Sequence, residues 1–257
     1  TNKISSAMIR KQAESEWSYV ILNEVDSTNN YAKKLVVNGE RKNTVVIAET
    51  QTLGRGRVGR PFYSPEGSGL YMSILIYPTL NVEYAPLITS FTAVAVAKAI
   101  EKLTDYNALK IKWVNDLYMN HKKICGILTE AGFDFEGGAI DYAVIGIGIN
   151  VLGLDFPEEI KDIATSIEKE TGKALSRNEI ASEILNHLSN LSESIKDRSF
   201  LDDYRERSNV IGKNILVIYG DEKFHAKAVG IDENAALVVE TERGIRTLNS
   251  GEVSIKI

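Results

Sequence analysis

The sequence predicts a mixed α/β fold, or α+β fold, followed by a small all-β domain. Through about the first 200 residues, apolar segments with strand character alternate with segments of helical periodicity. From roughly residue 212 the sequence changes to short β-rich runs separated by turn residues. With 257 residues, of which 44% are hydrophobic and 25% charged, the chain can bury one sizeable core and a smaller second one.

The first half of the sequence contains three expected strands and two expected helices. Residues 1–18 are polar and too few for a domain, so they are interpreted as a leader or a linker. Ser27 or Thr28, directly after the first strand, is a natural N-cap that opens a helix. An alanine-rich segment with apolar residues at helical spacing indicates a buried helix. The strands are expected at 19–25, 44–50 and 70–77, and the buried helix at 85–103.

The second half contains an expected hairpin, a strand with glycines, one long helix and several short strands. Residues 110–113 alternate polar and apolar, 118–122 form the turn region, and 123–130 return as a strand. In the apolar strand at 141–151, Gly146 and Gly148 leave room for something to approach the backbone. A capping box at 176–179 precedes apolar residues that mark one face of a long helix reaching residue 195. Runs at 215–219, 223–231, 235–240 and 253–257 indicate a small barrel of about five strands.

Composition excludes several classes of protein. A net charge of −5 argues against a protein whose main task is coating nucleic acid, since such binding depends on phosphate neutralisation. No apolar run reaches the about 20 residues that span a bilayer, so no membrane partner is expected. The single cysteine, Cys125, permits no intrachain disulfide, which suits a reducing cytoplasm. Three scattered histidines and one cysteine give no zinc-ligand spacing.

Residues 54–60, GRGRVGR, form what we call the arginine loop. The letters satisfy the G-x-G-x-x-G pattern and the glycine spacing of a P-loop, but both patterns must open a helix. Pro61 and Pro65 oppose a helix here, and the P-loop lysine and hydroxyl are missing. The remaining interpretation is a flexible loop whose arginines pair with phosphate or carboxylate. A solvated basic loop or a nonspecific nucleic-acid patch accounts for three arginines equally well.

Other polar residues stand at the ends of the expected strands, and each has an ordinary structural explanation. A Ser-Thr pair is commonly a helix cap, an Asn-Asp pair a turn, and a single strand lysine a solvated side chain. Their combination in one chain is what indicates a site. They are Ser27, Thr28, Asn29, Gln51, Asn115, Asp116, Lys123 and Asn150, together with the arginine loop.

In this order, five motifs closely resemble those of the biotin protein ligase family. They are DSTN at 26–29, QTLGRGRVGR at 51–60, KWVNDLY at 112–118, KICGILTE at 123–130 and GIGIN at 146–150. The similarity extends to GIDENAAL at 230–237 and GEVS at 251–254, so it covers nearly the whole chain after residue 19. Val114 departs from the usual proline of the third motif, and Lys256 stands where some members have an arginine directed at ATP.

The resemblance implies both a fold and a reaction. A catalytic domain at 19–211, with a mixed sheet and flanking helices like class II aminoacyl-tRNA synthetases, precedes an SH3-like barrel at 212–257. Biotin and MgATP form biotinyl-5′-AMP, and a lysine of a biotin carboxyl carrier domain then takes the biotinyl group. Residues 1–18 cannot hold the winged helix-turn-helix of bifunctional members, so we expect a form without DNA binding through this chain. A cytoplasmic homodimer is also expected.

The resemblance also assigns roles to individual residues, although it identifies no metal ligand. The catalytic residues would be Lys123, Arg57 and Asp116. Biotin would contact Ser27, Thr28, Asn29, Gln51, Arg55, Gly56, Arg57, Lys123 and Gly126. ATP and the adenylate would contact Arg55, Arg57, Arg60, Asn115 and Asn150. Cys125 is either a plain core residue or a small packing residue of the same pocket.

Two alternative functions remain at this point. A lipoate–protein ligase shares the fold and the adenylate chemistry, although the GRGRxGR and KWxND motifs together favour biotin. Adenylate formation with each acid would separate the two. A biotin-responsive transcriptional repressor is disfavoured by the acidic charge and by the short N-terminal segment.

Overall fold

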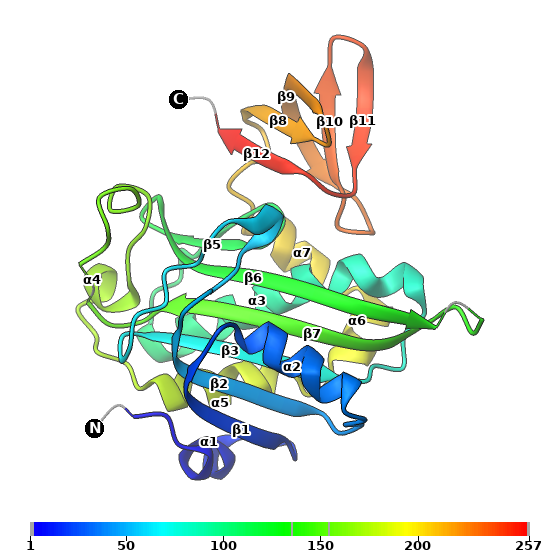
Figure 1. Cartoon of the computed structure of the whole chain (residues 1–257). Helices are drawn as coiled ribbons and strands as arrows, with labels where there is room; N and C mark the ends of the chain where they lie inside the picture. Colours follow the sequence, from blue (N-terminus) through cyan, green and yellow to red (C-terminus); the bar gives the residue numbers. More distant parts are fainter. Residues whose placement is uncertain (1–2, 135, 154, 256–257) are drawn as a thin grey trace.

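The structure is a computed structural model that describes residues 3–134, 136–153 and 155–255, and it confirms the expected mixed α/β fold. A seven-stranded sheet forms the centre of the larger part (Figure 1). Its first two strands are parallel, and all other neighbours are antiparallel. In spatial order the strands are β1 (Ser18–Val25), β2 (Thr44–Gln51), β3 (Gly69–Ile76), β7 (Ala139–Asn150), β6 (Lys122–Asp134), β5 (Asp116–Met119) and β4 (Lys110–Lys112).

The two faces of this sheet are covered differently. Because strand residues alternate between faces, Val45 and Ile47 join the main core while Val46 joins a small second core. The helices α3 (Ala85–Thr104) and α5 (Arg177–Leu188) cover the main-core face, and α2 (Thr28–Val37) lies on the other (Figure 1). Since α2 is short, it leaves part of its face of the sheet open. This is the face that carries the site.

The prediction of one long helix after residue 176 is wrong. The structure has two helices there, α5 and α6 (Leu191–Asp197). The Ser189 hydroxyl donates a 2.7 Å hydrogen bond to the carbonyl of Asn186, and Asn190 leaves the helical region with φ −107° and ψ 31°. Side chains of this type compete with the helical backbone for hydrogen bonds, which is a local reason for the break. Two further short helices were not anticipated, α4 (Ile167–Thr171) and α7 (Phe200–Glu206).

The expected hairpin turn also differs from the structure. Residues 110–119 are themselves a hairpin, in which Lys112 pairs with Asp116, and the next turn is confined to Asn120 and His121. Both turn residues have positive φ, 43° and 69°, so they reverse the chain tightly. Asp116 therefore begins a strand instead of ending one.

The segment before β1 contains a docked helix, α1 (Ser6–Gln12). Ile9 is fully buried, and the chain is held at both ends of the helix by amides of α5. Asn178 Oδ1 accepts from the Ser5 N–H at 2.8 Å, and Asn186 Oδ1 accepts from the Glu14 N–H at 2.8 Å. Hydrogen bonds of this kind, between side-chain amides and distant backbone groups, are not visible in a sequence pattern.

A second, antiparallel sheet of five strands forms the C-terminal part, in agreement with the about five strands predicted there. Its spatial order is β11 (Gly244–Leu248), β10 (Leu237–Thr241), β9 (Glu222–Ile231), β8 (Asn214–Tyr219) and β12 (Glu252–Ile255). It stands beside β5 and α7 at one end of the larger part (Figure 1). Within the described residues, no helix is long and apolar enough to cross a membrane.

Candidate functional site

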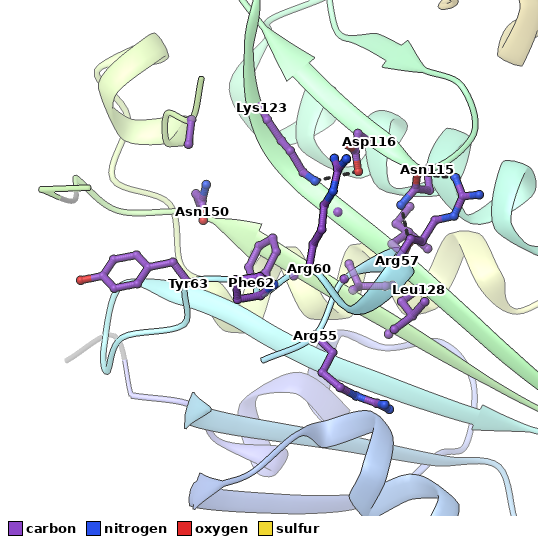
Figure 2. Close-up of a pocket in the computed structure, with 18 of the residues that line it drawn as sticks. Arg55, Arg57, Arg60, Phe62, Tyr63, Asn115, Asp116, Lys123, Leu128 and Asn150 are labelled. Carbon is purple, nitrogen blue, oxygen red and sulfur yellow. Dashed lines mark hydrogen bonds and ion pairs between the residues drawn. The ribbon is translucent and has the colours of Figure 1, made fainter. Parts of the chain in front are cut away.

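A cavity of about 490 Å³ opens on the α2 side of the central sheet, within the size range of small-molecule sites. The sheet forms its floor, and the arginine loop crosses it (Figure 2). Residues 156–164 contribute Phe156, Ile160, Ile163 and Ala164 to one wall, and β12 contributes Glu252, Val253 and Ser254. The pocket therefore lies between the two sheets.

Strand register explains why the floor is open. Asp116 pairs with Gly126, Gly126 with Gly148, and Gly148 with Tyr71, so these four residues form one row across the sheet. The two central residues of this row have no side chain. A Cβ at Gly148 would lie 2.6 Å from the Phe62 ring. The room expected at Gly148 is thus used by the segment that follows the arginine loop.

The next row of paired residues across the sheet also has a glycine at its centre. Leu128 pairs with Gly146, and Gly146 pairs with Ser73. The side chain of Asn29, at the start of α2, lies directly over Gly146, in the space where a Cβ would stand. Both glycines therefore admit a close approach, as predicted, and both spaces are filled by this chain's own side chains.

The arginine loop is not a helix, as its prolines predicted. It contains a single 3-10 turn, Arg57–Gly59, within which Val58 adopts the left-handed region with φ 54°. A β-branched residue is strained there, which is typical of loops that serve a ligand. Phe62 N–H donates to the Gly54 carbonyl at 2.8 Å and closes the loop.

Each arginine of the loop reaches a different neighbour. Arg55 donates to Asn30 Oδ1 at 2.8 Å, on α2. Arg57 donates to Asn115 Oδ1 at 3.3 Å and to the Gly251 carbonyl at 3.1 Å, next to β12. Arg60 forms an ion pair with Glu252 of β12. The loop therefore connects α2, the β4–β5 turn and the C-terminal sheet.

A cluster of buried amide and hydroxyl groups forms one end of the pocket. Gln51 Oε1 accepts from the Thr28 backbone N–H at 2.9 Å and lies 3.1 Å from the Thr28 hydroxyl. The Gln51 amide nitrogen donates to Ser64 Oγ at 3.0 Å. Ser27, 3% exposed, is the N-cap of α2 by position, but its side chain makes no capping bond. Its hydroxyl is consequently not used by the helix.

Cations gather at the other end. Lys123 Nζ lies 2.8 Å from Asp116 Oδ1, and Gly126 below it has no side chain to block the lysine (Figure 2). Lys112 also lines this end, and burial lowers the pKa of its ammonium. In the described residues no hydrogen bond or ion pair of the Lys112 side chain is found, whereas the other cations of the pocket all have one. An anionic ligand would supply the missing partner.

The two asparagines expected at the site are both anchored. Asn115 Nδ2 donates to the Ile127 carbonyl at 2.8 Å, which directs its oxygen to Arg57. Asn150 Nδ2 donates to the Thr165 carbonyl at 3.0 Å and is 5% exposed. Cys125 belongs to the main core and does not line the pocket, and burial raises the pKa of its thiol.

Every residue that the sequence assigns to the site lines this one pocket: Ser27, Thr28, Asn29, Gln51, Arg55, Gly56, Arg57, Arg60, Asn115, Asp116, Lys123, Gly126 and Asn150. Sequence reasoning missed Lys112, Phe62, Ser73 and Glu252. A serine within the apolar run at 70–77 was the one available signal for Ser73. Lys256 lies outside the described residues.

Metal binding by protein side chains alone is not supported. The described part of the chain contains no group of three or more His, Cys, Asp or Glu residues that could hold an ion. The pocket offers the carboxylates of Asp116 and Glu252, each paired with a cation. Mg²⁺ is commonly bound by one or two carboxylates together with substrate phosphates, so this donor set fits an ion that arrives with a nucleotide.

The fold and the pocket define a class of protein, the α/β proteins whose small-molecule site lies on an open sheet face beside a C-terminal five-stranded sheet. Residues 21–150 match the biotin/lipoate A/B protein ligase family, and residues 210–256 match the biotin protein ligase C terminal domain. The chain belongs to the biotin/lipoate A/B protein ligase family.

Individual relatives agree with this assignment. The chain is 34% identical to the bifunctional ligase/repressor BirA of Bacillus spizizenii, over 98% of this chain and 79% of that protein. It is 28% identical to the biotin–[acetyl-CoA-carboxylase] ligase of Paracoccus denitrificans, over 91% of this chain and 98% of that protein. The solved biotin protein ligase from Aquifex aeolicus in complex with biotin and ATP is similar with a TM-score of 0.77 and 34% identity, covering 93% of this chain and 98% of that one.

Proposed function

We propose that the chain is a biotin–protein ligase that activates biotin with MgATP and transfers it to a lysine of a biotin carboxyl carrier domain. One observation carries the proposal. In a chain of this family, a single pocket has neutral amide and hydroxyl groups at one end and a cluster of cations at the other. Biotin has the matching polarity, since its ureido head is neutral and its carboxylate is anionic.

The neutral end would hold the ureido group. Buried polar ligand groups require hydrogen-bond partners, and Thr28, Gln51 and Ser27 supply donors and acceptors there. Asn29 and Gly56 also border the pocket. In this pose the biotin carboxylate points along the floor toward Lys123.

The cationic end would hold the reacting groups. A carboxylate oxygen of biotin attacks the α-phosphorus of ATP, the bond from this phosphorus to the pyrophosphate oxygen breaks, and biotinyl-5′-AMP and pyrophosphate form. Lys123 lowers the repulsion between the two anions and stabilises the charge that develops on the α-phosphate. Asp116 orients Lys123, while Arg55, Arg57 and Arg60 hold the phosphates and Asn115 and Asn150 border the nucleoside. Mg²⁺ supplies charge neutralisation on the phosphates.

The second step needs a protected adenylate. The carrier lysine amine attacks the carbonyl carbon of the mixed anhydride, AMP leaves, and an amide forms. The arginine loop lies across the pocket and is suited to exclude water until the carrier arrives.

The first test is adenylation itself. Pyrophosphate release with MgATP should require biotin and should not occur at comparable rates with lipoate. Release with lipoate alone would favour a lipoate ligase and would contradict the proposed substrate.

We also infer the working state of the chain. A net charge of −5 supports a protein that does not bind nucleic acid through this chain. A homodimer in the cytoplasm is inferred from the resemblance to the family. Sedimentation of the ligand-free and biotinyl-5′-AMP-bound protein would test the dimer, and a DNA mobility shift would test nucleic-acid binding.

A further inference from the structure

Glu130 closes the motif at 123–130, yet no step of the proposed reaction uses it. Its carboxylate lies on β6, outside the pocket lining, and receives three donors. Lys33 Nζ is 2.7 Å from Oε1, Asn29 Nδ2 is 2.9 Å from Oε2, and Arg55 Nη2 is 3.4 Å from Oε2. One side chain thus connects α2, the arginine loop and the amide that covers Gly146.

The contact with Glu130 fixes the orientation of the Asn29 amide. Asn29 Nδ2 faces Glu130 Oε2 and, at 3.2 Å, the Leu128 carbonyl. Both groups only accept hydrogen bonds, so the amide nitrogen must point to them. The amide oxygen of Asn29 must therefore face Ser73, whose Oγ is 2.6 Å away.

The orientation of the Asn29 amide determines which hydrogen bonds the Ser73 hydroxyl makes at the pocket. Its fully buried hydroxyl lies between Asn29 Oδ1, at 2.6 Å, and Thr28 Oγ1, at 2.7 Å, but it carries one proton. Because the amide oxygen can only accept, the Ser73 proton is directed to Asn29. The Thr28 proton then has two acceptors, Ser73 Oγ at 2.7 Å and Gln51 Oε1 at 3.1 Å, and it goes to one of them. The Thr28 oxygen is left to accept from a ligand.

We propose that Glu130 is a positioning residue that sets the hydrogen-bond polarity of the biotin subsite, by way of Asn29 and Ser73. It makes the Thr28 hydroxyl an acceptor for an N–H group of the ligand. The proposal rests on the proposed function, since a ureido N–H is the ligand group that requires such an acceptor.

The ionisation of Glu130 supports this role. Partial burial raises the pKa of this carboxyl, but hydrogen bonds from Lys33 and Asn29 and the charges of Lys33 and Arg55 outweigh it. The net effect holds the pKa below its usual range, so the group stays an acceptor at neutral pH. A glutamine could instead donate to Asn29 and allow its amide to turn.

The experiment compares biotin affinities by titration calorimetry. Glu130→Gln should weaken biotin binding at least about fivefold, the loss of one oriented hydrogen bond, and leave ATP binding without biotin unchanged within about twofold. Glu136→Gln, an exposed residue on the same hairpin with the same change in charge, is the matched control and should bind biotin like the wild type.

A double-variant cycle separates positioning from general damage. Because Glu130 acts through Ser73, Ser73→Ala alone should weaken biotin binding, and adding Glu130→Gln should cost little more. Fully additive effects, or Glu130→Gln with wild-type affinity, would overturn the proposal. If Glu130→Gln lowers the unfolding midpoint too far to assay, unchanged affinity in Ser73→Ala overturns it instead. A wild-type protein that binds no biotin contradicts the proposed function and not this inference alone.

Discussion

Lys123 is the residue on which the proposed chemistry depends most. Its ammonium is held 2.8 Å from Asp116 and lies over a glycine, where a Cβ would approach it to 3.2 Å. This leaves a compact charge at the floor of the pocket. A guanidinium is planar and larger, so it cannot occupy the same position with the same direction of charge.

Lys123→Ala and Lys123→Arg should both slow adenylate formation by at least about tenfold, or ~1.4 kcal/mol of barrier. Single-turnover rates of adenylation, and of transfer from preformed biotinyl-5′-AMP, would measure the effect. Lys122→Ala is the control, because that neighbouring side chain turns away to the Lys161 carbonyl. Adenylation at the wild-type rate in Lys123→Ala would exclude the role.

Asn150 tests the proposed nucleotide end of the pocket. Its amide nitrogen is engaged by the Thr165 carbonyl, so its oxygen is the group left to accept from the adenine amino group. Guanine has a carbonyl at the corresponding position. Asn150→Ala should therefore reduce the preference of kcat/KM for ATP over GTP by about fivefold or more. A preference that stays at the wild-type value would remove the contact.

At the residue scale, the sequence predicted those site residues that belong to short motifs of neighbouring residues. Short motifs place Thr28, Gln51 and Lys123 at or near strand ends, and the fold brings such ends together. Ser73 and Phe62 could not be assigned, because their roles depend on which residues lie opposite in the sheet. That register is set by pairing between strands far apart in the chain.

At the scale of elements, the arginine loop joins the parts of the site. Arg57 reaches Asn115 on one side and the Gly251 carbonyl on the other, so it ties the loop to the C-terminal sheet. A loop held in this way can cover the adenylate.

Arg57→Ala should speed the release of biotinyl-5′-AMP into solution, because both anchors of the loop are lost together with a charge that we propose to bind phosphate. We expect free adenylate to rise about threefold or more, as the loss of such hydrogen bonds implies. Filtration and chromatography would measure this rise. Lys196→Ala, on α6 and outside the pocket lining, serves as the control. Equal retention in wild type and Arg57→Ala would show that the loop does not retain the intermediate.

Element boundaries were predicted best where hydrophobic periodicity is strong. The three strands at 19–25, 44–50 and 70–77 and the helix at 85–103 appear within one or two residues as β1, β2, β3 and α3. The break between α5 and α6 was missed because apolar spacing continued through Ser189 and Asn190. Spacing alone does not detect a local competing hydrogen bond.

At the scale of the whole molecule, contacts between the two parts complete the pocket. Trp113, 3% exposed, donates its indole N–H to the Ala235 carbonyl at 2.9 Å. Arg205 donates to the Ile231 carbonyl at 2.9 Å on the same side. These bonds hold the C-terminal sheet against the central one. A domain boundary near residue 212 stays a prediction.

Trp113→Phe should lower the free energy of unfolding by about 1–3 kcal/mol, because it leaves a buried carbonyl without its donor. Urea denaturation would measure the loss. Trp17→Phe is a matched control, since within the described residues the indole N–H of Trp17 has no hydrogen-bond partner. Equal losses in the two variants would mean that the Ala235 contact contributes nothing specific.

The most direct test of the central claim is mass spectrometry of a biotin carboxyl carrier domain incubated with this protein, biotin and MgATP. We expect a mass increase of one biotinyl group, located on a single lysine, that requires both biotin and ATP and is absent with Lys123→Ala under single-turnover conditions. A carrier domain that remains unmodified by the wild-type protein, or that gains a lipoyl group instead, would contradict the account.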